Sequence, residues 1–499
     1  MQDIDTLCKI TIILSVIVSL FTVRWAYFKI LKIAKDKNVV DNPDARKLQK
    51  TPVPVMGGIA VFIGVVAGLL MGATLCSAFE LESVVRLLPI VLAMIVMLYT
   101  GSMDDIIGLT PGSRIIIEIS TLIGLTVVSG CCVDSFHGLW GVEEVAWWVA
   151  ISISVVGGVG IINAVNMIDG VNGLSSGLCI SCCVMYGFVF YFSGDMANTL
   201  LAFSMAAALL PFFFHNVFGV RSRMFIGDAG TMVMGVLLTW FTFSVLCKDA
   251  DVAAKLHIPN ANLIAMALAI LSVPVFDTVR VMVMRMAKRQ SPFHPDKTHL
   301  HHVFVNVGIS HSIITFVEIS INLLVVAIWV LSVAFGASME WQLYIVIIAS
   351  LILVCGTYFF LRNQADRHTG FMHWLAHFSL STHLGDKNWW LKLQMLLDKG
   401  EMVDNQKPEN NENKPNNGYH IIFDPNPNNY KEHDRKKMLE FMKGKAEVLV
   451  DDIKQQSGAE ILRVDAMLSE GEVEGYIKVV SRTFNGSPII VTLVDNVTF

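Results

Sequence analysis

Long apolar segments alternate with short polar connections over the first 361 residues of the chain. Segments of roughly twenty apolar residues are long enough to cross the hydrocarbon core of a bilayer as a helix. The expected spans are residues 10–31, 53–75, 86–102, 115–131, 145–163, 175–193, 197–217, 231–247, 260–284, 312–335 and 340–361. The pattern therefore predicts an all-α polytopic membrane protein with about eleven transmembrane helices.

Basic residues gather in alternate connections between these segments. The connections after the first, seventh and ninth segments carry Lys32, Lys35, Lys37, Arg46, Lys47 and Lys50, then Arg221 and Arg223, then Arg285, Lys288, Arg289 and Lys297. The intervening connections are acidic or nearly uncharged. Because basic loops are retained in the cytoplasm, we expect the N-terminus outside and the C-terminus inside. The first segment lacks a small-residue cleavage site, so it is expected to remain as a span.

The character of the chain changes after residue 361. Residues 362–400 are polar and aromatic, which suits a stretch at the membrane interface. Residues 401–430 are rich in Asn, Pro, Glu and Lys and are expected to form a flexible linker. Residues 431–499 contain a helical stretch and β-branched alternations, which predict a small α+β cytoplasmic appendage. No motif in this appendage indicates its role.

Composition narrows the class of protein further. A hydrophobic content of 54% and a mean hydropathy of +0.57 exclude an ordinary soluble enzyme. The net charge of −5, without a separate basic arm, gives no reason to expect a nucleic-acid partner. Most of the nine cysteines lie in or beside apolar segments, while Cys131 and Cys132 lack zinc-site spacing and an obvious partner.

Two adjacent carboxylates, Asp104 and Asp105, stand at the end of an apolar span. Ionisable groups in that position are candidates for function, and neighbouring carboxylates repel each other unless a cation lies beside them. Magnesium is the simplest partner, because it takes oxygen ligands and is usually completed by substrate phosphates. A solvated helix end with two surface acids is the alternative.

Further polar clusters fall in other cytoplasmic connections. Asn163, Asn166 and Asp169 recur every three residues at the end of a span, which predicts a polar helical face. Asp228 lies between glycines just before another span, where it could bind a metal or cap the helix. In the first loop Arg46 is a candidate phosphate ligand, and Gly57 and Gly58 allow close approach to a ligand or a neighbouring helix.

The connection after the ninth span has the highest density of polar groups. It contains Arg285 and four histidines, at positions 294, 299, 301 and 302. Imidazoles could bind zinc, but the carboxylates and amides of the other loops suit magnesium, so phosphate binding is the preferred interpretation. Asp277 lies inside the preceding span and needs a partner such as Arg280.

These motifs, taken in order, resemble those of the polyprenyl-phosphate N-acetylhexosamine-1-phosphate transferases of glycosyltransferase family 4, which start bacterial glycan assembly. The resemblance covers about residues 1–361. It depends on Asp104-Asp105, Asn163-x-x-Asn166-x-x-Asp169-Gly170, Gly227-Asp228-Ala229-Gly230, Pro274-x-x-Asp277 and His299-Leu300-His301-His302. The histidine motif is similar to that of the N-acetylhexosamine branch rather than the peptidoglycan translocase. Positions Gln49, Val55 and Asn172 depart from the family pattern.

The resemblance implies transfer of a sugar 1-phosphate, most simply GlcNAc-1-phosphate, from a UDP-N-acetylhexosamine to undecaprenyl phosphate, with release of UMP. It implies Mg²⁺ or Mn²⁺ as cofactor, a bacterial inner-membrane location and a cytoplasm-facing site. The family's catalytic residues fall on Asp104, Asp105, Asp169 and His301, its metal-binding aspartate on Asp228 beside the Asp104–Asp105 pair, and its substrate-binding residues on Asn163, Asn166, His299 and His302. Arg46 and Arg285 are added as phosphate ligands from their own loops. Expected partners are both substrates and the bilayer, with a homodimer left open.

Two other activities compete with this interpretation. The first is a phospho-N-acetylmuramoyl-pentapeptide transferase, which uses the same lipid acceptor. The second is a secondary transporter, but transporters place their polar residues near the bilayer midplane in paired broken helices. Here the predicted topology puts every polar cluster at one membrane face, which favours a transferase.

Overall fold

The computed structural model describes most of the membrane half of the chain and part of the C-terminal half. The described residues are 2–41, 52–75, 81–248, 251–258, 260–291, 298–306, 309–366, 371, 374–375, 388–404, 437–443, 448–450, 452–453, 468, 477–482 and 488–493. The chain divides into two compact units, Met1–Pro408 and Glu409–Phe499. Each unit is described by itself.

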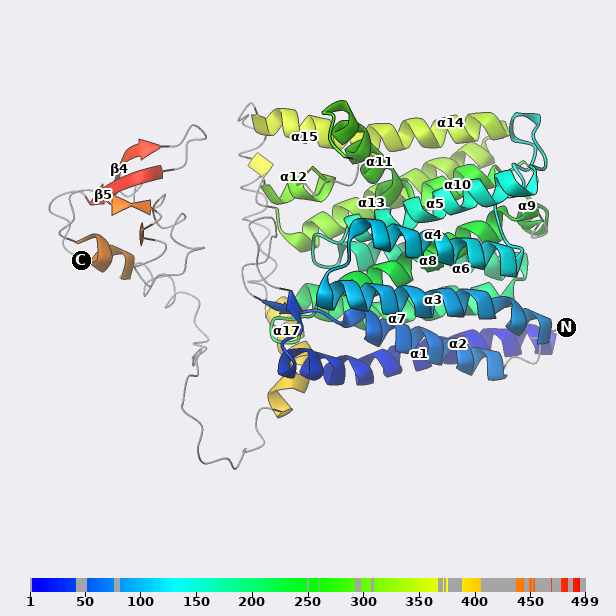
Figure 1. The fold of residues 1–499 in the computed structure, drawn as a ribbon, viewed down its shortest axis with the longest axis horizontal. Helices are drawn as coiled ribbons and strands as arrows, with labels where there is room; N and C mark the ends of the chain where they lie inside the picture. The colour runs from blue at the N-terminus through cyan, green and yellow to red at the C-terminus, as the bar shows by residue number, and fades with distance from the viewer. Residues whose placement is uncertain are drawn as a thin grey trace. The chain divides into compact units, whose positions relative to one another are not determined.

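The first unit is a bundle of long helices (Figure 1). Its long, unbroken helices are α1 (Gln2–Asp36), α2 (Gly57–Leu75), α3 (Leu81–Ile107), α4 (Pro111–Ser129), α5 (Trp147–Met167), α6 (Leu174–Ser193), α7 (Met196–Phe218), α8 (Gly227–Leu246) and α13 (His311–Ala334). A further span, Met339–Gln364, runs through α14 (Met339–Ser350), the segment Leu351–Gly356 and most of α15 (Thr357–Asp366).

An eleventh span is broken. Helices α10 (Leu263–Ile270) and α11 (Ser272–Ala287) together are long and apolar enough to cross a membrane, but they meet at an angle of 80°. The amide of Asn322 in α13 binds both sides of the break: its Nδ2 donates to Ile270 O at 3.0 Å, and its Oδ1 accepts from Ser272 Oγ at 3.0 Å. With ten unbroken spans and this bent pair, the prediction of about eleven membrane helices is confirmed for the described residues.

Further elements lie between the spans or after the last of them. They are β1 (Val40–Asp41), β2 (Val53–Pro54), a single 3₁₀ turn (Leu139–Gly141), α9 (Val252–Lys255), α12 (Leu300–Asn306) and α17 (Asn388–Asp404). Strands β1 and β2 pair antiparallel. In Figure 1 they lie at the same end of the bundle as α12, opposite the first residues of α1.

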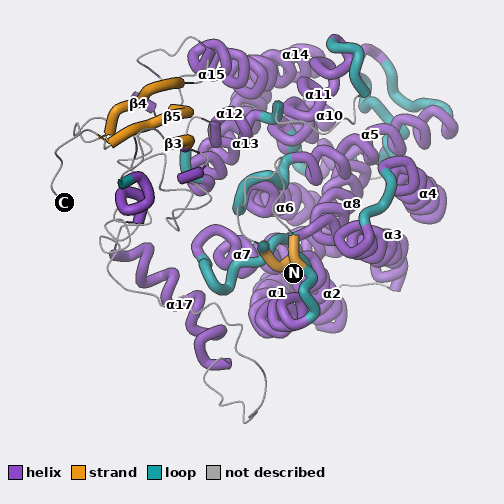
Figure 2. Tube along the Cα trace, turned by 60° about the vertical axis from the view of Figure 1, so that its left-hand side comes forward, coloured by secondary structure: helices purple, strands orange, loops and turns teal. Residues whose placement is uncertain are grey.

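Helix α8 forms the centre of the bundle. It packs against α2, α3, α5, α6 and α10, and its most apolar stretch is completely buried. Figure 2 shows α8 among α3, α5 and α6. Because a helix surrounded by others has no lipid-facing side, the direction of its first turn is set by its neighbours.

Glycines let the starts of α2 and α8 and the end of α3 meet backbone to backbone. A Cβ atom on Gly58 would lie 2.2 Å from the backbone N of Gly230, and one on Gly101 would lie 2.4 Å from the Cα of Ala229. The backbone N–H of Gly58 donates to Ile226 O at 2.8 Å. Gly58 therefore serves close packing with a neighbouring helix, one of the two roles predicted for the Gly57–Gly58 pair.

The second unit contains a small antiparallel sheet. Its strands β3 (Val448–Leu449), β4 (Ile477–Arg482) and β5 (Pro488–Leu493) are arranged in the order β3-β5-β4. A cluster that includes Met438, Met442, Ile453 and Val491 forms its described core. This unit therefore has an apolar core of its own.

Candidate active site

An arginine links acidic residues from three helices at the end of the bundle that carries β1, β2 and α12. Nη1 of Arg114, in the first turn of α4, lies 3.3 Å from Oδ2 of Asp104 in α3 and 3.4 Å from Oδ1 of Asp228 in α8. Its Nε donates to Oε1 of Glu118 at 3.1 Å. The Glu118 side chain is completely buried, so the guanidinium supplies the charge that its carboxylate needs.

Two asparagines of α5 extend this cluster. Asn163 Nδ2 donates to Glu118 Oε2 at 2.6 Å, and Asn166 Nδ2 donates to Asp228 Oδ1 and, at 2.7 Å, to Thr231 Oγ1. The three-residue spacing therefore does place both amides toward one polar cluster. Helix α5 ends at Met167, however, so Asp169 lies in the following turn rather than on the helical face predicted from the spacing.

The two adjacent aspartates have different surroundings. Asp105 Oδ1 accepts the backbone N–H of Asp228 at 2.8 Å, and its Oδ2 accepts that of Ala229 at 3.1 Å. Asp105 thus satisfies the exposed amides at the start of α8, where the helix dipole favours a carboxylate. Asp104 instead accepts the Leu109 N–H at 2.7 Å and faces Arg114. The cap of α8 is therefore Asp105, and the side chain of Asp228 faces the cluster.

The turn after α5 meets the histidine segment. Ser175 Oγ donates to Asp169 Oδ1, and a Cβ atom on Gly170 would lie 2.4 Å from Nε2 of His301. Desolvation by the surrounding protein, followed by the negative charge of Asp228, raises the pKa of Asp169 to about 6. The residue is nevertheless exposed, and water screens part of this effect. The turn therefore joins the histidines to the cluster around Arg114, which is called the arginine-centred cluster below.

Asp277 holds the first histidine in place. Its Oδ1 pairs with Arg280 Nη2 at 2.6 Å and its Oδ2 lies 2.8 Å from His299 Nδ1, which confirms Arg280 as the predicted partner. A carboxylate at Nδ1 directs that proton toward itself and leaves Nε2 for a ligand. The rings of His299 and His301 stack with centroids 5.7 Å apart, and His301 and His302 lie 4.4 Å apart.

His301 is almost completely buried, and its Nδ1 has no hydrogen-bond partner among the described residues. Burial, followed by the neighbouring His302 and His299, lowers the pKa of His301 well below its ordinary value. The ring is therefore neutral at physiological pH. A neutral imidazole can donate one hydrogen bond and accept another, but it cannot neutralise a phosphate by charge.

Of the two predicted phosphate ligands, Arg46 and Arg285, the structure describes only Arg285. Arg46 lies outside the described residues, as does His294. Arg285 is buried in the last turn of α11. The other predicted site residues all belong to the two joined clusters.

Three residues at this end were missed by sequence reasoning. Arg114 and Glu118 are spaced as i and i+4 on α4, a signal for a helical ion pair that could have been noticed. Asp398 of α17 gave no signal. It accepts the backbone N–H of Val220, Arg221 and Ser222 at 3.3, 3.2 and 3.0 Å, and the Ser222 hydroxyl at 2.6 Å. It thereby fixes the loop that leads into Asp228.

The donor set fits a hard cation that is completed by a ligand. Within the described part of the chain, Asp228 Oδ1 accepts hydrogen bonds while Oδ2 accepts none, and 33% of the side chain is exposed. No group of three or more acidic, histidine or cysteine side chains among the described residues is arranged to hold a metal alone. Magnesium fits such a site because it is usually held by one or two carboxylates together with water and phosphate oxygens.

Comparison with known proteins agrees with this arrangement. The profile of glycosyl transferase family 4 matches residues 87–246, which include the arginine-centred cluster and the turn after α5. A probable undecaprenyl-phosphate N-acetylglucosaminyl 1-phosphate transferase of Bacillus subtilis (strain 168) is 30% identical over 303 residues, covering 60% of this chain and 79% of the relative.

Enterobacterial proteins give similar matches. The undecaprenyl-phosphate alpha-N-acetylglucosaminyl 1-phosphate transferase of Escherichia coli O157:H7 is 29% identical over 306 residues, 58% of this chain and 75% of the relative. The protein of the same name from Yersinia pestis is 30% identical over 283 residues, 56% of this chain and 72% of the relative. The motifs converge at one end of a membrane bundle, and the matches agree with them. The chain therefore belongs to glycosyl transferase family 4, as a membrane transferase of the polyprenyl-phosphate N-acetylhexosamine-1-phosphate type.

Proposed function

We propose that the protein transfers N-acetylglucosamine 1-phosphate from UDP-N-acetylglucosamine to undecaprenyl phosphate, releasing UMP. The product would be the first lipid-linked intermediate of a cell-envelope glycan. The observation that carries this proposal is the convergence of Arg114, Asp228 and the histidine segment at one end of the bundle, joined by the turn that holds Asp169 and Gly170. The names of the relatives supply the sugar.

The reaction displaces one phosphate ester by another. An oxygen of the lipid phosphate attacks the sugar-linked phosphorus of the UDP-sugar, the bond from that phosphorus to the bridging oxygen breaks, and UMP leaves with that oxygen. Such transfers depend mainly on positioning and on stabilising charge. A phosphate monoester is already largely ionised near neutral pH, so we favour a single displacement that needs no covalent aspartyl intermediate.

Asp228, with Asp104 beside it, is the residue we assign to a divalent cation. When bound, Mg²⁺ or Mn²⁺ would neutralise negative charge on the pyrophosphate and on the departing UMP. Asp105 holds the start of α8 so that the Asp228 carboxylate faces the site. Arg114 keeps Asp104 and Asp228 together. Asn166 orients Asp228 through a hydrogen bond.

The histidine segment is assigned to substrate phosphates. His299, oriented by Asp277, presents its other ring nitrogen for a hydrogen bond, and neutral His301 can donate one without adding charge. His302 and the basic side chains Arg46 and Arg285 complete this assignment. Asp169 lies on the exposed turn between the two clusters, where its carboxylate can accept a proton or a hydrogen bond from a substrate hydroxyl.

The site is assigned to the cytoplasmic face of a bacterial inner membrane. UDP-sugars are cytoplasmic, and the basic loop residues Arg221 and Arg223, together with Arg285 at the end of α11, lie at the end of the bundle that carries the site. The acceptor reaches this face within the lipid leaflet, so both substrates meet at the ends of the helices. The chain can act as one copy or as a homodimer under this proposal.

Membranes that contain the protein provide the direct test. Incubation with labelled UDP-N-acetylglucosamine, undecaprenyl phosphate and Mg²⁺ should give lipid-linked label and UMP, and Asp228→Ala membranes with equal protein should give neither. Parallel reactions use UDP-N-acetylgalactosamine and UDP-N-acetylmuramoyl-pentapeptide. Faster labelling from either one would overturn the sugar assignment. Absence of lipid-linked label from all three would overturn the function, and a burst of UMP without acceptor would overturn the single displacement.

A further inference from the structure

A cavity of about 540 Å³ lies at the end of the bundle opposite the candidate active site. Its lining comes from the second turn of α3, the first turn of α7, the last turns of α6 and α8, the short helix α9 and the segment that follows α4. Two of the lining residues are cysteines, Cys131 and Cys247. By the orientation proposed above, this end faces the outside of the cell.

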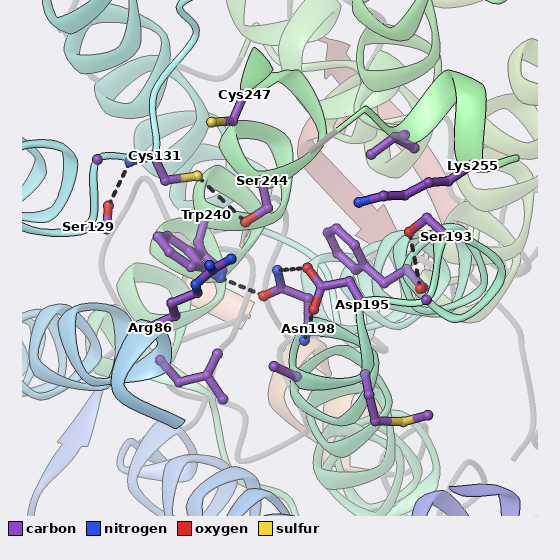
Figure 3. A pocket seen from close by; sticks show the side chains of 17 residues that line it. Arg86, Ser129, Cys131, Ser193, Asp195, Asn198, Trp240, Ser244, Cys247 and Lys255 are labelled. Atoms are coloured by element: carbon purple, nitrogen blue, oxygen red, sulfur yellow. Dashed lines mark hydrogen bonds between the residues drawn. The ribbon is translucent and has the colours of Figure 1, made fainter. Parts of the chain in front are cut away.

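The two thiols are directed toward each other. Figure 3 shows the sulfur atoms of Cys131 and Cys247 pointing into the same space, although the residues are more than a hundred positions apart in the chain. Their side chains are within hydrogen-bonding contact. Cys131 also lies 3.9 Å from Ser244 Oγ, one turn before Cys247 on α8. Two thiols that face each other in this way are the arrangement from which a disulfide forms.

We infer that Cys131 and Cys247 form a structural disulfide between the ends of α4 and α8 in the mature protein. Two S–H bonds break and one S–S bond forms, while two protons and two electrons pass to a disulfide-bearing thiol oxidant of the extracytoplasmic compartment. Such compartments are oxidising, whereas cytoplasmic thiols stay reduced. The cysteines inside the bundle are shielded from this reaction, because Cys179, Cys182 and Cys183 are almost completely buried in α6.

The surroundings favour a stable bond over a reactive switch. Hydrogen bonding to Cys247, followed by burial, raises the pKa of Cys131, and burial raises the pKa of neighbouring Cys132 to about 11. Thiols of this kind are rarely ionised, so they are poor nucleophiles once the protein is folded. The bond would therefore form as the protein matures and remain.

This position relates the disulfide to the active site. Helices α4 and α8 begin at Pro111 and Gly227, and their first turns carry the Arg114–Asp228 ion pair. A covalent link at the other ends of the same two helices would restrict their relative sliding. The two connections together would fix α4 and α8 relative to each other across the whole bundle.

Thiol titration of the full-length protein tests the inference. Protein from its own membranes, purified without reductant and unfolded in denaturant, should show two fewer thiols than the nine found after reduction. Cys247→Ser and Cys131→Ser should each show the same number before and after reduction. The matched variant Cys132→Ser should still gain two thiols on reduction. Equal counts for the wild type, or a gain of two in Cys131→Ser, would overturn the pairing.

Two further measurements test the outward location of Cys247 and the contribution of the disulfide to stability. A membrane-impermeant thiol reagent applied to intact cells after reduction should label Cys247 in the wild type and should leave Cys182, which is buried in α6, unlabelled. Label at Cys247 that appears only after the cells are opened would overturn its outward location. Reductant should lower the thermal unfolding midpoint of the wild type by several degrees and leave that of Cys247→Ser unchanged. These outcomes do not depend on which sugar is transferred, so failure here and failure of the proposed function are distinguishable.

Discussion

The carboxylate of Asp105 accepts the backbone N–H of Asp228 at 2.8 Å. One aspartate of the adjacent pair therefore acts on the backbone that carries the candidate metal ligand. Asp105→Asn keeps one acceptor oxygen and should retain part of the activity, whereas Asp105→Ala should lower kcat at least a hundredfold. The loss of the cap should also reduce the free energy of unfolding by about 1 kcal/mol.

Steady-state kinetics and denaturant titration of both variants check this assignment. A metal ligand or general base at this position would make Asn as damaging as Ala. Equal inactivity of the two variants, with the thermal midpoint of the wild type, would contradict the positioning role of Asp105. The comparable substitution Asp228→Asn should abolish activity with little change in stability, because Asp228 is partly exposed.

Arg114 neutralises a buried carboxylate as well as two at the site. Arg114→Ala leaves Glu118, whose side chain is completely buried, without its charge partner and should destabilise the protein by roughly 3–5 kcal/mol. Adding Glu118→Gln removes the uncompensated charge while keeping a group that can bind Asn163. The double variant should therefore recover most of the stability but not the activity.

A double-mutant cycle of unfolding free energies measures this coupling. Activity that returns together with stability would show that Arg114 serves folding alone. Arg114→Lys provides an intermediate case, since lysine keeps the charge but cannot span several carboxylates with a planar fork. Its kcat should fall by about 10- to 100-fold, a loss of roughly 1.4–2.7 kcal/mol in the barrier.

Gly170 and His301 test the contact between the two clusters. A methyl group at Gly170 would lie 2.4 Å from Nε2 of His301, so Gly170→Ala should displace the imidazole and lower kcat at least tenfold. The protein should remain folded, because the ring can rotate away. Gly157→Ala and Gly160→Ala on the preceding helix have no atom within 4 Å of the added methyl group and serve as controls. Wild-type kcat in Gly170→Ala would contradict a role for His301.

Asp398 connects α17 to the loop that precedes Asp228. Asp398→Ala removes the acceptor for three backbone amides and one hydroxyl, and hydrogen bonds to charged groups contribute about 1.5–3 kcal/mol each. We expect faster amide exchange at residues 220–222 and a lower kcat with little change in KM. Lys392→Ala, an exposed position of the same helix, is the control. Unchanged exchange at residues 220–222 would contradict the contact.

The sequence pattern was a good guide to the spans but not to their interruptions. Apolar length alone located the long helices, because the bilayer sets that length. The bend between Ile270 and Ser272 had a local signal in Pro274, which has no N–H to donate to Ile270 O. What the local pattern did not show is Asn322, about fifty residues later on α13, which binds backbone on both sides of the break. A local pattern cannot report a contact between residues so far apart in the chain.

The candidate site was predicted in its residue types and only partly in its contacts. Each motif lay at the end of a span, and the predicted topology placed those ends on one face. The separate surroundings of Asp104 and Asp105 depend on where α8 begins, which is fixed by backbone contact at Gly101 and Gly58. Asp398 belongs to a segment predicted only as interfacial, and no periodicity indicated that it would bind the loop before Asp228.

The neutral state of His301 predicts how stability depends on pH. Its folded-state pKa is lowered, chiefly by burial, so between that value and the unfolded value near 6.5 the unfolded chain binds more protons. The contribution of neutral His301 to the stability of the protein is therefore full above about pH 6.5 and is lost as pH falls below that value. His301→Gln cannot take up this proton, so its thermal midpoint should fall less than that of the wild type between pH 7.5 and roughly pH 5. Parallel midpoints for the two proteins over this range would show that the ring is protonated in the folded state, and the phosphate would then meet a cation at His301 rather than a neutral donor.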